Sequence, residues 1–475
     1  MEDADAPLLA AWRRALDGGV VPFTIPGHKR RAGAVWPTLG LAVDSDIPLY
    51  AGLDTMKGAA AALTAAEAHG AALWGADWCR YSTGGSTQVN QVAALALGAP
   101  GAPVLVSRTA HRSTLSGLIL AGLEPVWLPT DVDARFGLPS GLSVPVVERA
   151  LRDHPDAVGL ICVEPSYVGT LSPLPDIVAA AHAHDVPVVV DQAWAGHFGF
   201  HPGYPPHALQ VGADVMITSA HKVLPAYSQG AVIAARTDRV DAERLDRAFD
   251  ALGTTSQAGS ILASVDASRA LLAAPLGHDL LDRLLGLVAD ARSKLRAAGL
   301  DVPGPEDFPP GRFDPAKLVV TLTDADGIAI EDELIAAGLP LEQADRDTIV
   351  AIVTMLDDAS TVDRLCREVI EAATRAATPP RPRVPSAVWT AEIPPAAMSP
   401  RAAFFAGHEL VTAERAVGRA SAELIAPYPP GIPVVAPGEL ITSGVISSLR
   451  AAREAGLRIA YAGDPTLTSF RVVIE

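Results

Sequence analysis

Two charged side chains follow apolar runs in a way that core packing does not explain. Lys222 closes the segment ADVMITSAHK (213–222), and Asp191 ends VPVVVD (186–191). A lysine held away from water has a lowered pKa, and its neutral amine is a nucleophile for aldehydes. A carboxylate on a neighbouring strand would keep a pyridine nitrogen protonated, which makes the ring an electron sink. The pair predicts pyridoxal 5'-phosphate chemistry, with Lys222 holding the cofactor as a Schiff base.

A glycine-rich turn offers a place for the phosphate of such a cofactor. The turn TGGST (83–87) stands immediately before a helix expected over 88–98. Glycines let the backbone approach a ligand closely, the first N–H groups of a helix bind anions, and hydroxyls add donors. The same turn also occurs in ordinary loops and helix caps. Combined with Asp191 and the motif SAHK (219–222), it favours a phosphate cradle.

A parallel sheet would bring these residues together. Between about residues 60 and 275, helical patterns alternate with short apolar runs rich in β-branched residues, at 103–107, 158–164, 186–191, 213–219 and 230–235. Such alternation is typical of an α/β fold with a mainly parallel sheet covered on both faces. Ligands of these sheets bind beyond the carboxyl ends of the strands, where Lys222 and Asp191 stand.

Patterns along the rest of the chain suggest further units. An amphipathic helix over 277–298 precedes strands at 317–323 and 348–356 and helices at 330–338 and 358–376. Helices are also expected near 412–424 and 441–456. A Pro-rich stretch is the best linker candidate. We therefore expect an N-terminal segment 1–59, a large domain 60–275, a small α/β domain 276–377, a linker 378–397 and a C-terminal subdomain 398–475.

Composition excludes several classes of protein. The formal net charge of −17 over 475 residues argues against a general nucleic-acid or anionic-membrane surface, because phosphate binding needs basic patches. Cys79, Cys162 and Cys366 are too widely spaced for a disulfide framework or a cysteine-based zinc site. No apolar run approaches a membrane span, and the acidic amino terminus does not resemble a signal peptide. We expect a soluble cytoplasmic enzyme.

Two pairs of histidines have spacings that invite a metal interpretation. His197 and His201 are four residues apart, but the glycine between them argues against a helix, so no metal is expected. His182 and His184 are two residues apart on a predicted helix, so they point to different sides, and we expect both to face solvent.

The motifs taken together resemble a known family. The chain is similar to the ornithine/lysine/arginine decarboxylases of the aspartate-aminotransferase-like fold, known as fold-type I, in a short bacterial form without the wing domain. The resemblance rests on IPGHKR (25–30), GLDTMKG (52–58), WGADWCRYSTGGST (74–87), SRTAHRST (107–114), EPSYVG (164–169), VVVDQAWAGHFGFH (188–201), GADVMITSAHKVLPAYSQGA (212–231) and APYPPGIPVVAPGE (426–439). It implies a three-layer sandwich with a smaller C-terminal α/β domain.

The resemblance also implies a role for each matching residue. Catalytic roles fall to Lys222 as the cofactor lysine, Asp191 facing the pyridine nitrogen, His111 stacked on the ring, and His221 beside the lysine. The other cofactor-binding residues it implies are Gly85, Ser86, Thr87, Ala193 and Ser219, with Thr255 and Ser256 reaching the phosphate of a partner subunit. Trp194 and Glu439 are the residues that it suggests for the substrate.

The chain departs from the family pattern at three places, one of which is Val223 where a threonine or leucine usually follows the lysine. A family segment of the type TSPSY reads TTSQAGS (254–260), which puts the partner contact in doubt. Glu164 replaces a threonine or serine before a proline, which predicts an extra negative charge near the site.

The implied reaction is the α-decarboxylation of lysine, ornithine or arginine to a polyamine-type amine and CO2, in a homodimer with shared active sites. Which of the three amino acids is used stays open. Alternatives are another reaction of the same cofactor, such as transamination, racemisation or β-elimination, and a non-catalytic cofactor-binding regulatory protein.

Overall fold

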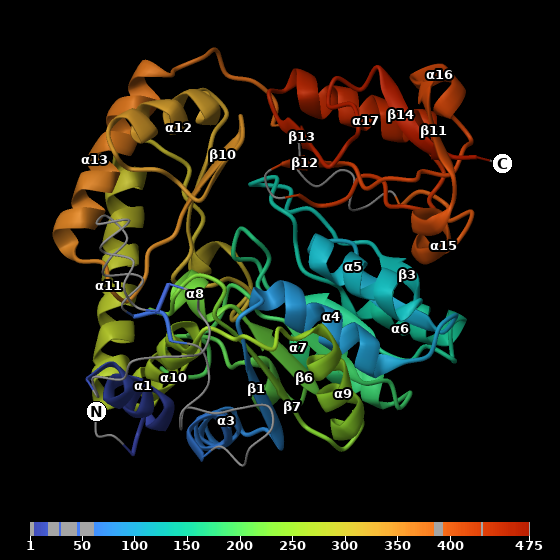
Figure 1. Cartoon of the computed structure of the whole chain (residues 1–475). Helices are drawn as coiled ribbons and strands as arrows, with labels where there is room; N and C mark the ends of the chain where they lie inside the picture. Colours follow the sequence, from blue (N-terminus) through green and yellow to red (C-terminus); the bar gives the residue numbers. More distant parts are fainter. Residues whose placement is uncertain are drawn as a thin grey trace.

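A seven-stranded sheet forms the centre of the larger part of the molecule (Figure 1). The computed structural model describes residues 4–17, 28–29, 45–47, 61–383, 393–428 and 431–474. Across the sheet the strands run in the order β1 (Trp78–Ser82), β7 (Ala231–Ala235), β6 (Val215–Thr218), β5 (Val188–Asp191), β4 (Leu160–Val163), β2 (Pro103–Ser107) and β3 (Glu124–Leu128). Only β7 is antiparallel to its neighbours among these strands, which confirms the predicted mainly parallel sheet.

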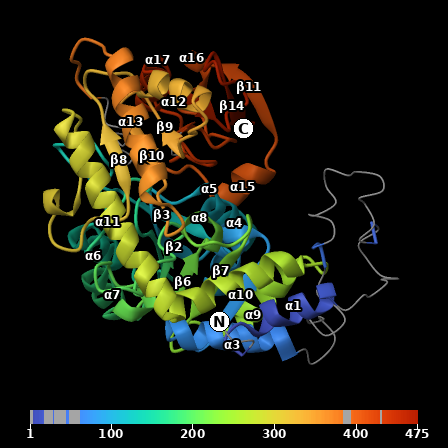
Figure 2. The ribbon, with the colours of Figure 1, turned by 90° about the vertical axis from the view of Figure 1, so that its left-hand side faces the viewer.

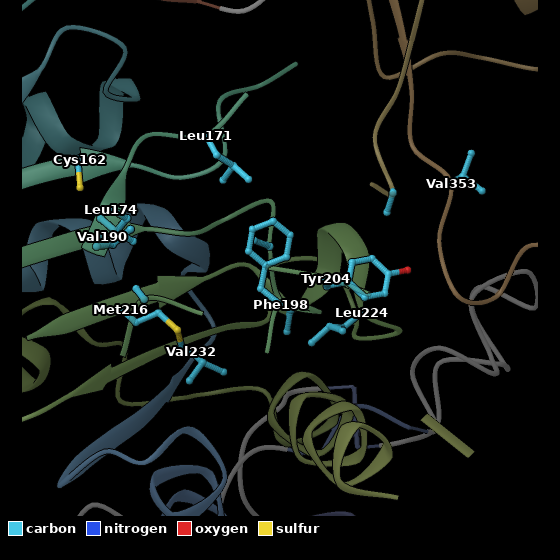
Figure 3. Packing of buried hydrophobic residues seen from close by; sticks show 14 of the residues in the cluster. Cys162, Leu171, Leu174, Val190, Phe198, Tyr204, Met216, Leu224, Val232 and Val353 are labelled. Carbon is cyan, nitrogen blue, oxygen red and sulfur yellow. The ribbon is translucent and has the colours of Figure 1, made fainter. Parts of the chain in front are cut away.

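Successive strand residues point to opposite faces of this sheet, and both faces are buried. In β4, Leu160 and Cys162 belong to one core cluster, whereas Ile161 and Val163 belong to the other. Figure 3 shows Cys162, Val190, Met216 and Val232 from four neighbouring strands in the first of these clusters. Burial on both faces explains why the strands read as continuous apolar runs rather than as alternating patterns.

Helices supply the two outer layers. One face packs against α4 (Gly85–Leu97), α5 (Arg112–Ala121) and α9 (Ala242–Leu252). The other packs against α1 (Pro7–Asp17), α3 (Ala61–Trp74), α6 (Val144–Asp153), α7 (Leu174–His182) and α10 (Gly259–Ala273). Helix α4 begins at Gly85, three residues before the predicted start. Among the described residues there is no helix long and apolar enough to cross a membrane.

A long helix, α11 (Pro275–Ala297), leads from the large sheet to a small antiparallel sheet (Figure 2). That sheet has the order β8 (Leu318–Thr321), β10 (Thr348–Ala351), β9 (Gln343–Ala344), and it is joined by α12 (Gly327–Ala336) and α13 (Ala359–Arg375). The order strand, helix, strand, helix is the one predicted for 317–376, although the strands are shorter. The predicted linker is described only at 378–383 and 393–397, and Arg381 there forms an ion pair with Asp347, 3.1 Å away.

The C-terminal part lies beside α5, in red at the upper right of Figure 1. It contains α15 (Pro400–Phe405), β11 (His408–Thr412), α16 (Ala413–Ala416), β12 (Ala426–Tyr428), α17 (Ser443–Glu454), β13 (Arg458–Ala460) and β14 (Ser469–Val473). The predicted helix near 441–456 is present as α17. The helix predicted near 412–424 is limited to α16, because the chain turns at Gly418, whose φ is +83°, and then forms bridges from Ala420 and Ser421 to other segments.

A buried ion pair fastens this C-terminal part to the large sheet. Arg108 follows β2, and its guanidinium donates to both carboxylate oxygens of Glu439 at 2.5 and 2.9 Å. The two side chains are almost fully buried, at 0% and 3% exposure. A third bond runs from Arg108 to the carbonyl of Val434 at 3.0 Å, and Glu439 also accepts the N–H of Ala436 at 2.7 Å. Both carboxylate oxygens and two of the three guanidinium nitrogens are therefore bonded, whereas Nε of Arg108 has no partner among the described residues.

We predict that Glu439→Ala destabilises the protein by about 3–5 kcal/mol, because it leaves the Arg108 guanidinium buried without its partner. The measurement is the free energy of unfolding from urea titrations followed by circular dichroism. Glu409→Ala is the matched control, since Glu409 pairs with Arg419 at 3.1 Å and is 43% exposed. An exposed pair contributes at most about 1 kcal/mol. Equal losses in the two variants would refute an anchoring role for Glu439.

Candidate active site

A cavity of about 380 Å³ opens where the predicted chemistry was expected, at the carboxyl ends of β4, β5 and β6. Most of the predicted site residues line it: Gly85, Ser86, Thr87, His111, Asp191, Ala193, Trp194, Ser219, His221 and Lys222. These residues come from four separate stretches of the chain, so the parallel sheet and the two helices that begin at its edge bring them together.

Asp191 is buried at the end of β5, with donors on both of its carboxylate oxygens. The side-chain amide of Asn90, on α4, donates to Oδ2 at 2.8 Å, and the N–H of Ala193 donates to Oδ1 at 3.1 Å. A buried carboxylate with a donor on each oxygen is held in one orientation. The Asp191 carboxyl group is therefore fixed in the wall of the cavity.

His111 is the N-cap of α5 and is part of the same network. Its Nδ1 accepts the N–H of Ser113 at 3.2 Å and contacts the Ser113 hydroxyl at 2.8 Å. That hydroxyl in turn accepts from the amide of Asn90 at 3.0 Å. Burial lowers the pKa of His111 below its ordinary 6.5, against the opposing effect of Asp191. The ring is therefore neutral at pH 7, and a neutral ring can lie flat against an aromatic ligand.

The start of α4 forms an anion-binding end of the cavity. The hydroxyls of Ser86 and Ser219 lie 2.6 Å apart, which places two donors together. Gly85 has a φ of +64°, a conformation that favours glycine, and its N–H donates to the carbonyl of Gln229 at 2.8 Å. The next N–H groups, of Ser86 and Thr87, have no acceptor within the described part of the chain. These free N–H groups and the positive end of the helix favour a phosphate here.

Lys222 projects over the indole ring of Trp194, with Nζ 4.0 Å from the ring centroid. Burial lowers the pKa of Lys222 below its ordinary 10.5, although Asp191 and Glu342 oppose the shift. The adjacent His221 donates from Nδ1 to the carbonyl of Gly230 at 3.0 Å, which leaves its Nε2 free. The site thus contains an amine that loses its proton more readily than an exposed lysine.

The structure adds residues that the sequence did not single out. Tyr167, Ser228 and Gln229 line the cavity, and the Tyr167 ring meets Trp194 edge-on, with centroids 6.3 Å apart. Asn90 lies beneath the cavity and orients Asp191. An asparagine inside the apolar helix sequence QVNQVAALAL was the available signal, since a buried amide needs polar partners.

Glu439 does not line the cavity, so the substrate role suggested for it is wrong. Both of its oxygens are occupied by Arg108. Trp194, the other residue suggested for the substrate, is in place.

Glu164 is not an extra charge facing the cavity either. It is buried, and it accepts the N–H of Ser172 at 2.8 Å. Burial raises its pKa to about 7, with Arg312 among the groups that oppose the shift. The Glu164 carboxyl group therefore belongs to the packing behind the site.

Thr255 and Ser256 lie outside the cavity of their own chain. Both are exposed, and the Ser256 hydroxyl contacts that of Thr254 at 3.1 Å. Their predicted contact with a partner subunit stays a prediction. The motif segments IPGHKR and GLDTMKG lie outside the described residues, apart from His28 and Lys29.

In the part of the chain that the structure describes, the histidines of each pair contact different acidic residues or none, rather than a common partner. His197 contacts Asp314 at 3.4 Å and His201 contacts Asp282 at 3.5 Å. No group of metal-binding residues occurs among the residues that the structure describes. The expectation that His182 faces solvent is wrong, because it is half-buried and contacts Asp214 at 2.8 Å; His184 is exposed. The three cysteines are buried, free thiols.

Comparisons with known proteins point in one direction. The family model described as Orn/Lys/Arg decarboxylase, major domain, matches residues 6–305, and the one for the C-terminal domain matches 385–459. An arginine decarboxylase of Halalkalibacterium halodurans is 34% identical and aligns over 96% of this chain and 95% of its own length. An arginine decarboxylase of Bacillus subtilis is 32% identical over 100% of this chain and 99% of its own length.

Solved structures show the same fold. The lysine decarboxylase LdcF of Francisella novicida superposes with a TM-score of 0.84 at 19% identity, covering 99% of this chain and 81% of that one. The constitutive lysine decarboxylase of E. coli superposes with a TM-score of 0.81 at 20% identity, covering 100% and 82%. A serine palmitoyltransferase of Sphingomonas wittichii gives 0.57 at 18% identity, covering 78% and 84%. The predicted aspartate-aminotransferase-like fold is therefore confirmed.

We predict that Lys222 reacts with a small aldehyde at lower pH than an exposed lysine does, because only the neutral amine reacts and burial lowers the pKa of Lys222. Ligand-free protein is treated with formaldehyde and cyanoborohydride across a pH series, and methylation is followed by peptide mass spectrometry. Lys294 is the control, since its bond to Asp363 raises its pKa. The methylation rate of each lysine is divided by the rate of the same lysine at high pH, which removes differences in how easily the aldehyde reaches the two amines. The prediction is contradicted if the pH at which Lys222 reacts at half of its maximal rate is equal to or higher than that of Lys294.

Proposed function

The chain belongs to the Orn/Lys/Arg decarboxylase family, and from this premise we propose that it decarboxylates a basic amino acid with pyridoxal 5'-phosphate bound at Lys222. The observation that carries the proposal is the single cavity that joins Lys222, Asp191 and His111 to the hydroxyl pair of Ser86 and Ser219. A core or surface role for any one of these residues would not require that they meet.

The residues present fit this cofactor. Free N–H groups at the start of α4 and the hydroxyls of Ser86 and Ser219 suit its phosphate. The oriented carboxylate of Asp191 suits the pyridine nitrogen, and the neutral His111 suits a ring face. Lys222 supplies the amine for the aldehyde.

When bound, pyridoxal phosphate supplies an aldehyde that holds amines covalently and a protonated ring that accepts the electron pair left at Cα as CO2 departs. Asp191 would hold the proton on the ring nitrogen by a charge-assisted hydrogen bond. That bond is strong because Asn90 and Ala193 already fix the carboxylate, so no reorientation is needed during the reaction.

Lys222 would then move a proton. Burial lowers the pKa of its Nζ, so this amine would give up a proton more readily than an exposed lysine. With substrate bound, Nζ could take a proton from solvent and give it to Cα of the substrate. His221, with Nε2 free, is the second group placed to exchange a proton beside Lys222.

We propose arginine as the first substrate to test, with lysine and ornithine beside it. Three Halalkalibacterium and Bacillus relatives that are 30–34% identical to this chain carry the name arginine decarboxylase. The net charge of −17 favours the approach of a cationic substrate. The product would be a polyamine-type amine. Three free thiols suit a reducing compartment, so a cytoplasmic location is part of the proposal.

The test is to incubate cofactor-loaded protein with each of the three amino acids and to identify the products. We expect CO2 and the corresponding amine, and borohydride should attach the cofactor to the peptide that contains Lys222. Lys222→Ala should lose turnover completely, whereas Lys294→Ala, at an exposed site, should keep it. A keto acid in place of CO2 would favour transamination. No product at all, with cofactor bound, would favour a non-catalytic regulatory protein.

We propose a homodimer with shared sites. Three large aromatic side chains near the cavity are left exposed in the single chain: Tyr227 at 53%, Tyr428 at 48% and Tyr461 at 40%. Tyr227 stands next to Ser228 in the cavity wall, and Tyr428 and Tyr461 both act electrostatically on Tyr167. A partner surface over these rings would bury apolar area and keep water from the reaction.

Mixing two inactive variants tests the shared site. Lys222→Ala protein is combined with a variant in which Thr255 and Ser256 are both alanine. If the 254–260 loop completes the partner's site, hybrid dimers carry one intact site, and roughly a quarter of full activity should return after random exchange. Exchange of subunits is checked with differently tagged chains. Full activity of the loop variant alone would end the assignment of Thr255 and Ser256, and exchange without recovery would end the shared site.

A further inference from the structure

A second lysine, from the small sheet, contacts a residue of the cavity wall. Lys317 stands immediately before β8, and its side chain is 5% exposed. Its Nζ lies 4.5 Å from the ring centroid of Trp194, the same indole that lies 4.0 Å from Nζ of Lys222. Trp194 lines the cavity, so two amines from different parts of the fold contact the same residue of its wall.

The surroundings of Lys317 hold it in place. A Cβ at Gly169 would lie 2.8 Å from both Cβ and Cγ of Lys317, so the aliphatic stem packs directly on a residue that has no side chain. The Lys317 N–H donates to the carbonyl of Asp314 at 3.1 Å, and its own carbonyl accepts from Arg292 at 2.7 Å. The backbone is thus held by bonds on both sides, and the side chain extends from it to Trp194.

The ammonium group is left without a hydrogen-bond acceptor among the described residues. The nearest acid, Asp314, uses Oδ1 for His197 at 3.4 Å and for the N–H of Ala316 at 2.9 Å. Burial lowers the pKa of Lys317 to about 8, with Lys222 adding to the decrease and Asp314 and Glu342 opposing it. At neutral pH the group is therefore mostly charged. A buried charge without an acceptor is costly, and a bound anion removes that cost.

We propose that Lys317 binds the α-carboxylate of the amino-acid substrate. The inference rests on the proposed function, and it names a substrate-binding residue that the reaction scheme above does not use. The phosphate of the cofactor would already have its donors at the start of α4 and at Ser219. The α-carboxylate is the only anionic group of a basic amino acid, and it must lie close to the amine that reacts at Lys222.

This contact distinguishes substrate from product. The amine formed by decarboxylation has no carboxylate, so Lys317 stabilises the bound amino acid and contributes nothing to the bound product. Loss of the carboxylate therefore weakens binding of the product relative to the substrate.

The test compares an amino acid with the amine made from it. Lys317→Met keeps the length of the stem against Gly169 but removes the charge, and Lys294→Met, exposed and paired with Asp363, is the matched control. For arginine with agmatine, and likewise for lysine with cadaverine and ornithine with putrescine, we measure the KM of the amino acid and the inhibition constant of the amine. The change in the cofactor's visible absorption on rapid mixing gives binding before turnover.

We expect Lys317→Met to weaken binding of the amino acid by roughly 10- to 100-fold, the loss typical of a hydrogen bond to a charged group. Binding of the amine, affinity for the cofactor and kcat should change little. Lys317→Gln, which keeps a donor but no charge, should lie between the parent and Lys317→Met. Its melting temperature and that of Lys317→Met show whether each variant is folded.

Equal weakening of amino acid and amine by both Lys317 variants would overturn the inference, as would lower cofactor affinity or a lower kcat at unchanged KM. These results leave the proposed function intact, because the parent would still release CO2. If the parent itself binds none of the three amino acids, the proposed function fails first, and the inference fails with it.

Discussion

A buried carboxylate needs donors on every side, and this requirement organises the cavity. Asp191 receives its donors from Asn90 and Ala193, and Asn90 also bonds Ser113, whose hydroxyl contacts His111. One chain of hydrogen bonds therefore joins β5 to the first turns of α4 and α5. Because an uncompensated buried charge costs several kcal/mol, these elements cannot shift independently without losing stability. The hydrogen bonds that orient Asp191 therefore also hold the three elements together.

A backbone hydrogen bond joins the start of α4 to the segment that follows Lys222. The N–H of Gly85, at the start of α4, donates to the carbonyl of Gln229, in the loop between α8 (Ala220–Val223) and β7. Lys222 belongs to α8, so the helix that offers N–H groups to an anion and the segment that carries the lysine share a backbone bond. The distance between the two ends of the cavity is thereby set by the backbone rather than by long side chains.

The sequence was sufficient for those parts of the site that depend on local order. Asp191, Ser219 and Lys222 follow apolar strands, and the carboxyl ends of parallel strands meet at one edge of a sheet, so their meeting was predictable. Glu439 was misassigned because its partner Arg108 is 331 residues away, and no local pattern shows such a pairing. Lys317 was passed over for the same reason, although a lysine beside an apolar strand is the pattern that identified Lys222.

The fold shows the same division. Helices with strong apolar periodicity and the inner strands were predicted within a few residues, because their patterns are local. The region 412–424 reads as a helix, yet Gly418 and the bridges of Ala420 and Ser421 to distant segments outweigh that preference. The partners of those bridges lie at Leu440 and Val472, so tertiary contacts decided the outcome.

The place of β1 in the sheet has a consequence for synthesis of the chain. Among the described strands β1 pairs with β7 alone, so residues 78–82 can join the sheet only after residues 231–235 have been synthesised. Helix α4 follows β1 directly and depends on Gln229 for its first N–H. On the ribosome the amino-terminal part emerges first, and pairings between distant segments are slow to form. The first edge of the sheet to be translated is therefore among the last to close, and until it closes the nascent chain exposes an apolar strand that invites association with other chains.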